Sequence, residues 1–201
     1  IYNPLNKKEI LEKSKKIKKK NFKTKKLKIL NVGRFVDQKD QITLLKALNL
    51  IKDRINFEAI IMGKGILKNE LNKFIITNNL KKNVRLINFQ DNPYRAIKEC
   101  DLFILSSTFE GLPNVLLEAA SLRKFIISSN CRTGPSEILQ AGKGGYLFKV
   151  KNYKELSKKI MLIAKKPHLK KKYINITYNS LDRFDLNINF KKYENLIKEL
   201  I

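Results

Sequence analysis

Short apolar runs recur along the chain, and longer stretches of mixed apolar and polar residues separate them. The runs are continuously apolar, which is typical of parallel strands that are buried on both faces. They predict strands at residues 27–33, 56–63, 83–89, 101–107, 124–129 and 144–150. With 201 residues, the chain can form one sizeable core or at most two small ones.

Helical spacing of the apolar residues fills the gaps between these strands. It predicts helices at about 40–51, 66–79, 93–100, 114–122 and 134–141, and three more at 151–164, 167–180 and 187–200. Asp40 is a candidate cap for the first helix, since its carboxylate can accept hydrogen bonds from free backbone N–H groups. The alternation predicts an α/β fold, a Rossmann-like parallel sheet of about six strands with helices on both faces.

The pattern also predicts how the chain is organised. Residues 1–26 form a Lys-rich linker or leader, in which 7–26 are expected to be a solvated helix or leader. Residues 27–180 form the Rossmann-like domain, and 181–201 add a C-terminal helix. Because no further strand follows them, the last three helices should pack outside the sheet or onto another domain.

The formal net charge of +25 indicates an anionic partner. Nucleic acid is one candidate, but seven of the 43 basic residues are Arg and the other 36 are Lys. Base-reading and bidentate phosphate sites favour Arg. The Lys residues are scattered along the whole sequence, so contact with an anionic membrane surface is favoured over nucleic acid.

Two further compositional features concern location. No stretch approaches the roughly 18 uninterrupted apolar residues of a membrane span. Cys100 and Cys131 are too few for a disulfide framework and have no metal-ligand spacing. We therefore expect reduced thiols in a cytoplasmic protein that can lie peripherally on the inner face of the membrane.

Chemically distinctive residues follow four of the predicted strands. They are Gly33-Arg34, Gly63-Lys64-Gly65, the segment Ser106 to Glu110, and the segment Ser128 to Gly134. Turn formation explains any one of these sites. Four on the same edge of a sheet indicate a crevice, because ligands of open α/β sheets bind outside the carboxyl ends of the strands.

The first two segments point to an anion site and away from common nucleotide motifs. Gly63-Lys64-Gly65 lacks the full dinucleotide fingerprint, and the chain has no Walker motif, so nicotinamide and ATP sites are poorly supported. Its glycines would let the backbone approach a ligand closely. Arg34 and Lys39 flank a helix start, which suits a diphosphate. The alternative is that both are surface cations.

The most specific pattern is FEGLPNVLLEAAS at 109–121. It holds Glu110 in a loop and Glu118 about one turn into the next helix. A carboxylate accepts two hydroxyl donors side by side, so it suits the vicinal diol of a ribose or a hexose. Residues Gly111 to Asn114 would present backbone N–H groups to phosphate or sugar oxygens. Against the reading of Glu118 as an ordinary surface residue, its neighbours are apolar.

These residues resemble the C-terminal donor-binding domain of the family 4 (group 1) retaining glycosyltransferases, which have the GT-B fold. The similar segments are NVGRFVDQKD, IIMGKG, DLFILSSTFEGLPNVLLEA, TGPSEIL and GGYLF, in this order over about 27–150. IYNP at residues 1–4 resembles the linker between the two domains of that family. TGPSEIL resembles versions from transferases that build cell-surface glycans with N-acetylhexosamines.

The resemblance implies roles for single residues. Arg34 and Lys39 match the diphosphate-binding pair, Glu118 the residue that holds the ribose hydroxyls, and Glu110 the one that contacts the donor sugar. Together, Glu110, Arg34 and Lys39 are the implied catalytic residues. The implied donor-binding set is Gly33, Gly63, Gly65, Glu110, Gly111, Leu112, Pro113, Asn114 and Glu118.

The implied reaction moves a hexose from a nucleotide-diphospho-sugar, with a UDP-sugar favoured, to a glycan or lipid-linked acceptor. No cofactor or metal is implied, and the sequence has no Asp-x-Asp. The pathway would be cell-surface polysaccharide or lipopolysaccharide biosynthesis. His168, the sole histidine, is expected at the surface and not as a base.

The sequence departs from the family in two ways. Asn88, Arg123 and Phe125 stand where Gly, Gly and Pro are common. An N-terminal acceptor domain is also missing, so that domain or a partner chain is an expected partner, and the helix near 187–200 is expected to dock on it. Two alternatives remain, a non-catalytic or partner-dependent nucleotide-sugar-binding subunit and, less favoured, a basic nucleic-acid-binding domain.

Overall fold

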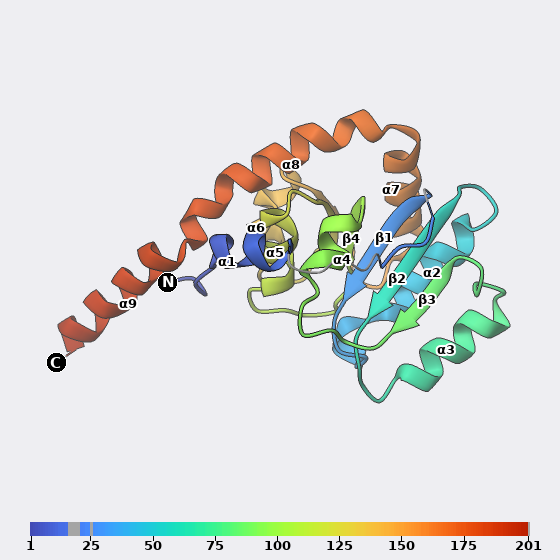
Figure 1. Cartoon of the computed structure of the whole chain (residues 1–201), viewed down its shortest axis with the longest axis horizontal. Helices are drawn as coiled ribbons and strands as arrows, with labels where there is room; N and C mark the ends of the chain where they lie inside the picture. The colour runs from blue at the N-terminus through green and yellow to red at the C-terminus, as the bar shows by residue number, and fades with distance from the viewer. Residues whose placement is uncertain (16–20, 25, 201) are drawn as a thin grey trace.

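The computed structural model describes residues 1–15, 21–24 and 26–200, and within them six parallel strands form one sheet (Figure 1). The strand order is β3-β2-β1-β4-β5-β6. The strands are β1 (Leu27–Val32), β2 (Phe57–Met62), β3 (Val84–Ile87), β4 (Leu102–Leu105), β5 (Phe125–Ser129) and β6 (Tyr146–Phe148). The predicted parallel sheet is confirmed, and its order reverses between β1 and β4.

Helices connect the strands and follow the last one, as predicted. They are α1 (Lys7–Lys13), α2 (Gln41–Ile51), α3 (Lys68–Thr77), α4 (Tyr94–Glu99), α5 (Asn114–Ser121), α6 (Pro135–Ile138), α7 (Tyr153–Lys165), α8 (Lys170–Asn179) and α9 (Leu186–Leu200). Short 3-10 turns are η1 (Asp37–Lys39), η2 (Gln140–Gly142), η3 (Pro167–Leu169) and η4 (Ser180–Phe184). The Asp40 side chain caps α2 by accepting from the Thr43 backbone N–H, as predicted.

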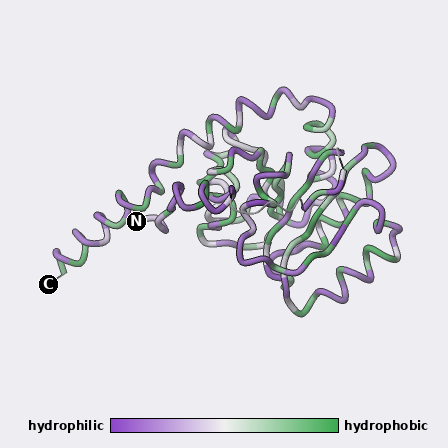
Figure 2. Tube along the Cα trace, viewed as in Figure 1, coloured by the Kyte–Doolittle hydropathy of each residue, from purple (hydrophilic) through white to green (hydrophobic). Residues whose placement is uncertain are grey.

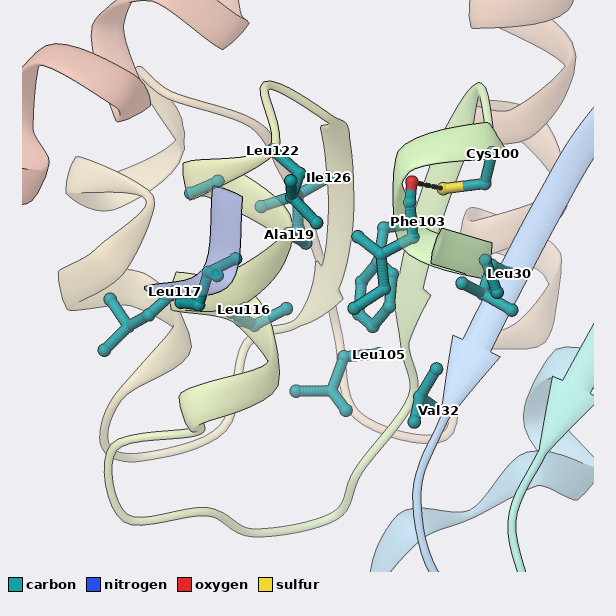
Figure 3. Packing of buried hydrophobic residues seen from close by; sticks show 14 of the residues in the cluster. Leu30, Val32, Cys100, Phe103, Leu105, Leu116, Leu117, Ala119, Leu122 and Ile126 are labelled. Carbon is teal, nitrogen blue, oxygen red and sulfur yellow. Dashed lines mark hydrogen bonds between the residues drawn. The ribbon is translucent and has the colours of Figure 1, made fainter. Parts of the chain in front are cut away.

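Successive residues of each strand pack on opposite faces of the sheet, so the core has two halves. Leu30 and Phe103 lie in the half covered by α1, α4, α5, α6 and η4 (Figure 3). Ile29 and Leu102 lie in the half covered by α2, α3, α7 and α8. Because both faces are covered, most strand residues are apolar, and much of the sheet is coloured as hydrophobic in Figure 2.

The N-terminal segment packs on the sheet domain more closely than the sequence predicted. α1 is a helix, but Ile10 is buried in the first core half, and Phe22 beyond it is buried too. The expectation of a wholly solvated helix is therefore wrong for these side chains, whose apolar area favours burial. Residues 16–20 and 25 of the predicted Lys-rich segment lie outside the described residues.

The start of the chain meets the start of α9. Leu5 N–H donates to Phe184 O at 2.8 Å, and Tyr2 N–H donates to the buried Asn189 side chain at 3.1 Å. Beyond Asn189, α9 extends away from the sheet (Figure 1) and exposes apolar side chains, among them Phe190 and Ile197. None of the described helices is long and apolar enough to cross a membrane.

Candidate functional site

A cleft of about 520 Å³ lies at the carboxyl ends of β1, β2 and β4. This is the edge where the strand order reverses, and it is the expected place for a ligand of such a sheet. Most of the residues that the sequence singled out line it, namely Gly33, Arg34, Lys39, Gly63, Glu110, Leu112, Pro113, Asn114 and Glu118. The fold therefore brings together side chains from three separate loops.

Gly65 and Gly111 are not among the lining residues of this cleft. At Gly65 the backbone φ is +153°, and a Cβ would clash with the backbone of Phe35. At Gly63 a Cβ would clash with the carbonyl oxygen of Gly33. The two glycines thus allow the loops after β1 and β2 to approach each other. The expected close approach to a ligand is not what requires glycine at Gly65.

Lys39 and Glu110 form an ion pair in the cleft. The Lys39 ammonium Nζ lies 2.6 Å from Glu110 Oε1, and both side chains are largely buried, with 17% and 7% of their area exposed. Ser107 donates its hydroxyl proton to the same carboxylate oxygen at 2.5 Å. The Ser107 hydroxyl and the Lys39 ammonium fix the Glu110 carboxylate. The carboxylate in turn holds the ammonium group within the cleft.

Backbone contacts join the turn that carries Lys39 to the loop that carries Glu110. Thr108 N–H donates to Gln38 O at 2.8 Å, and the Gln38 side chain donates to Phe109 O at 3.0 Å. Ser106 donates its hydroxyl to Lys39 O at 3.0 Å. These bonds connect the segments that follow β1 and β4. They therefore fix the two segments that carry Lys39 and Glu110.

Arg34 stands at the mouth of the cleft with an exposed side chain. Its backbone carbonyl accepts from the Gln41 side chain at 2.9 Å, which fixes the turn between β1 and α2. The backbone of Arg34 is thereby fixed, and no hydrogen bond or ion pair of its guanidinium is found among the described residues. Such a cation can close over an anion that enters the cleft.

Glu118 is a mostly buried carboxylate, and no cation within residues 1–15, 21–24 and 26–200 forms an ion pair with it. Burial raises its pKa from 4.5 to about 6, because a low-dielectric surrounding disfavours the charged form. Among the described residues, no hydrogen bond to its carboxylate is found. Tyr94 faces the same part of the cleft, and its pKa is raised first by burial and then by the negative charge of Glu118. The Glu118 carboxylate can therefore accept hydrogen bonds from the donors of a ligand.

The start of α5 offers backbone donors to the same cleft. Pro113 occupies the N-cap position, and no side chain there bonds the free N–H groups of the first turn. Leu112, Pro113 and Asn114 all line the cleft. A ligand with oxygen acceptors can satisfy these groups, since the N-terminus of a helix favours negative charge.

The sequence prediction missed four cleft residues after β3, namely Phe89, Asp91, Pro93 and Tyr94. The sequence pattern places Phe89 at the end of a predicted strand, Asp91 in the connection after it, and Pro93 and Tyr94 at the start of a predicted helix. Their position offered a signal, because the segment after a third parallel strand must reach the same sheet edge as the others. His168 is exposed in η3 and does not line the cleft, as predicted.

Comparison with known proteins gives a family match over most of the chain. The profile described as "Glycosyl transferases group 1" matches residues 12–180. An uncharacterized glycosyltransferase of Methanocaldococcus jannaschii is 42% identical over 111 residues, which are 55% of this chain and 27% of the relative. A Campylobacter jejuni enzyme is 30% identical over 157 residues, 78% of this chain and 42% of that enzyme. Its name is N-acetylgalactosamine-N,N'-diacetylbacillosaminyl-diphospho-undecaprenol 4-alpha-N-acetylgalactosaminyltransferase.

The fold is also similar to solved structures. One is the crystal structure of Anabaena HepE in complex with UDP-glucose, with a TM-score of 0.78 and 22% sequence identity. The match covers 87% of this chain and 49% of HepE. The chain thus spans less than half the length of each of these three proteins.

Proposed function

Since this chain belongs to the glycosyl transferases group 1 family, we propose that its cleft binds a nucleotide-diphospho-sugar, with a UDP-sugar favoured. The observation that carries the proposal is the arrangement of charges in the cleft. The cations Arg34 and Lys39 and the carboxylates Glu110 and Glu118 all line it. A nucleotide sugar has an anionic diphosphate between two polyhydroxylated rings, and this arrangement complements both parts.

The diphosphate is proposed to lie between Arg34, the Lys39 ammonium and the N-terminus of α5. Each of these groups stabilises negative charge, and that charge grows on the leaving diphosphate as the bond to the sugar breaks. The ion pair with Glu110 keeps Lys39 in place before the ligand arrives. In this role Arg34 and Lys39 act on the reacting atoms.

The two carboxylates are proposed to hold the two rings. Glu118 has no ion-pair partner and no hydrogen-bond donor among the described residues, so the two hydroxyls of a ribose fit it well. Its raised pKa of about 6 still leaves it mostly ionised at pH 7. Glu110 is proposed to contact the transferred hexose while one of its oxygens keeps Lys39 and Ser107.

The transfer itself is proposed to retain the configuration of the sugar and to serve cell-surface polysaccharide or lipopolysaccharide synthesis. The Campylobacter jejuni relative supports a lipid-linked or glycan acceptor, because its name specifies a diphospho-undecaprenol substrate. We also propose that another domain or a partner chain supplies the greater part of the acceptor site. The exposed apolar side chains of α9 support that part, since residues 181–201 would bury them on such a partner.

The test is calorimetry of the 201-residue chain with UDP and with GDP. We expect UDP to bind, and we expect Arg34→Gln to weaken it by about tenfold or more, as loss of a charge-assisted contact does. Arg54→Gln is the matched control, since Arg54 is an exposed arginine after α2 and does not line the cleft. If neither nucleotide binds, or if both variants bind alike, the proposal fails. Tight UDP binding without sugar transfer favours the partner-dependent form.

A further inference from the structure

A second hollow, of about 640 Å³, lies beside the loop after β5. Three cations line it, Arg132, Lys143 and Arg183, against one carboxylate, Glu137. One oxygen of that carboxylate already accepts the hydroxyl proton of Tyr2. The hollow therefore offers positive charge to an anion, and its size is within the range of roughly 300–1,000 Å³ typical of small-molecule sites.

This hollow shares a wall with the cleft described above. Thr133, which lines the hollow, donates its hydroxyl to the backbone oxygen of Glu110. Gly134 packs so tightly against Gly111 and Pro113 that a Cβ at this position would clash with both. A molecule in the hollow would thus lie on the other side of the loop whose Glu110 faces the cleft.

The kind of cation in the hollow carries information. The chain uses 36 Lys and seven Arg, and several of the Arg residues have a specific partner. Arg85 pairs with Glu58 and Arg95 with Glu99, while Arg123 stacks on the Tyr178 ring. At these three positions the planar guanidinium fork or face makes contacts that a Lys ammonium would not reproduce.

The two arginines of the hollow differ in how they are held. Arg183 is fixed, because its guanidinium donates to Glu137 O at 2.6 Å and to Ser180 O at 3.2 Å. Arg132 is exposed, and no hydrogen bond or ion pair of its side chain is found within residues 1–15, 21–24 and 26–200. The Arg183 guanidinium is thus held in place at the side of the hollow, and the Arg132 guanidinium is available to a ligand.

We infer that this hollow binds the phosphate or diphosphate group of the acceptor substrate. The inference rests on the proposed function, since the neighbouring cleft must hold the donor for an acceptor to lie here. Arginine binds phosphate oxygens through two parallel N–H donors, and Lys143 adds a further positive charge. A phosphate held at this wall would keep the rest of the acceptor near the sugar contacted by Glu110.

Another hollow in the same molecule has the same balance of charges but a different composition. It measures about 710 Å³ and is lined by Lys52, Lys81, Lys82 and Asp53, with the same balance of three cations and one carboxylate. Lys81 and Lys82 precede β3, so this hollow lies at the amino edge of the sheet, opposite the cleft. It contains no Arg among its lining residues in the described chain. It provides a matched control.

The experiment is calorimetry of pyrophosphate with the full chain in saturating UDP, which occupies the first cleft. We expect a second pyrophosphate site, and we expect R132Q combined with K143Q to weaken it by about tenfold or more. K81Q combined with K82Q removes the same charge from the control hollow and should change the affinity less than about twofold. UDP binding should be unchanged in both double variants.

Several results would overturn the inference. One is that UDP displaces all pyrophosphate, because then the anion occupies only the first cleft. Another is an equal loss in both double variants, which would mean that overall charge drives binding. A third is that glucuronate binds as tightly as pyrophosphate, which would mean that the hollow recognises carboxylates and not phosphates in particular. Failure of UDP to bind is a separate outcome, which overturns the proposed function and, with it, the assignment of this hollow to an acceptor.

Discussion

Glu118 is mostly buried and has no ion-pair partner in the part of the chain that the structure describes, and this lowers stability at high pH. Its pKa rises from 4.5 to about 6 on folding, so the unfolded chain loses this proton at lower pH than the folded protein. The free energy of unfolding therefore falls as pH rises from about 4.5 to 6, and the full cost is present above that range. We expect Glu118→Gln to raise the free energy of unfolding by about 1–2 kcal/mol at pH 8 and hardly at all at pH 4.

Urea denaturation at the two pH values measures this difference. Glu70→Gln is the control, because Glu70 is an exposed glutamate of α3 and its replacement changes the net charge equally. In the same samples Glu118→Gln should lose UDP affinity, since an amide accepts two hydroxyls less well than a carboxylate. A variant that is less stable at pH 8 would show that Glu118 serves the fold and not a ligand.

The residues of the cleft were mostly predictable, but their pairings were not. Glu110, Glu118, Arg34 and Lys39 could be assigned to one sheet edge because each follows a recognisable strand. That Lys39 and Glu110 form an ion pair depends on the conformations of two loops 71 residues apart. Gly65 was predicted to lie close to a ligand for a similar reason. The sequence does not show that the backbone of Phe35 lies against Gly65.

The connection between α5 and β5 contains a residue in a strained conformation. Arg123 has φ +54°, a left-handed conformation that glycine adopts without cost. Its guanidinium stacks on the Tyr178 ring of α8, 3.6 Å from the centroid, and Lys7 of α1 lies over the same ring at 3.9 Å. The stacking contact shows what an Arg side chain gains at a position whose backbone conformation favours Gly. The backbone strain is offset by a contact that ties α5 to α8.

Two substitutions separate the strain from the stacking. Arg123→Ala removes the cation and keeps the strain, so we expect a loss of about 0.5–2 kcal/mol in the free energy of unfolding. Arg123→Gly removes both, and we expect it to be more stable than the Ala variant by about 1 kcal/mol. Urea unfolding of the wild type and the two variants measures these values. Equal midpoints for Ala and Gly would contradict the strain.

Elements were predicted better than their ends. The helix predicted over 134–141 ends at Ile138, because Gln140 and Ala141 both take positive φ values near 50° and interrupt it. Positive φ at Ala is rare, so nothing in that sequence pattern indicated a break. Pro167, by contrast, marks the start of η3 before α8, as a residue with fixed φ does at a helix start.

At the scale of the whole molecule, the parallel sheet and the resemblance to group 1 glycosyltransferases are confirmed, since the ordered motifs follow successive strands. The packing of residues 1–15 and 21–24 was less predictable. Lys dominates their composition, whereas single apolar side chains such as Leu5, Ile10 and Phe22 dock them on the core. A few buried residues decide the position of a segment that looks solvated on average.

The net charge of +25 predicts binding to anionic lipid, whereas the exposed apolar side chains of α9, such as Phe190 and Ile197, predict binding to neutral lipid as well. We expect the charge to dominate, because Lys residues lie along most of the chain and each gains about 1 kcal/mol near an anionic surface. The protein should then sediment with phosphatidylglycerol vesicles at low salt and be released at about 0.5 M NaCl, where screening is strong. It should not sediment with phosphatidylcholine vesicles. Binding to these neutral vesicles, resistant to salt and lost when Phe190 and Ile197 are both replaced by Ser, would show that α9 inserts its apolar side chains instead.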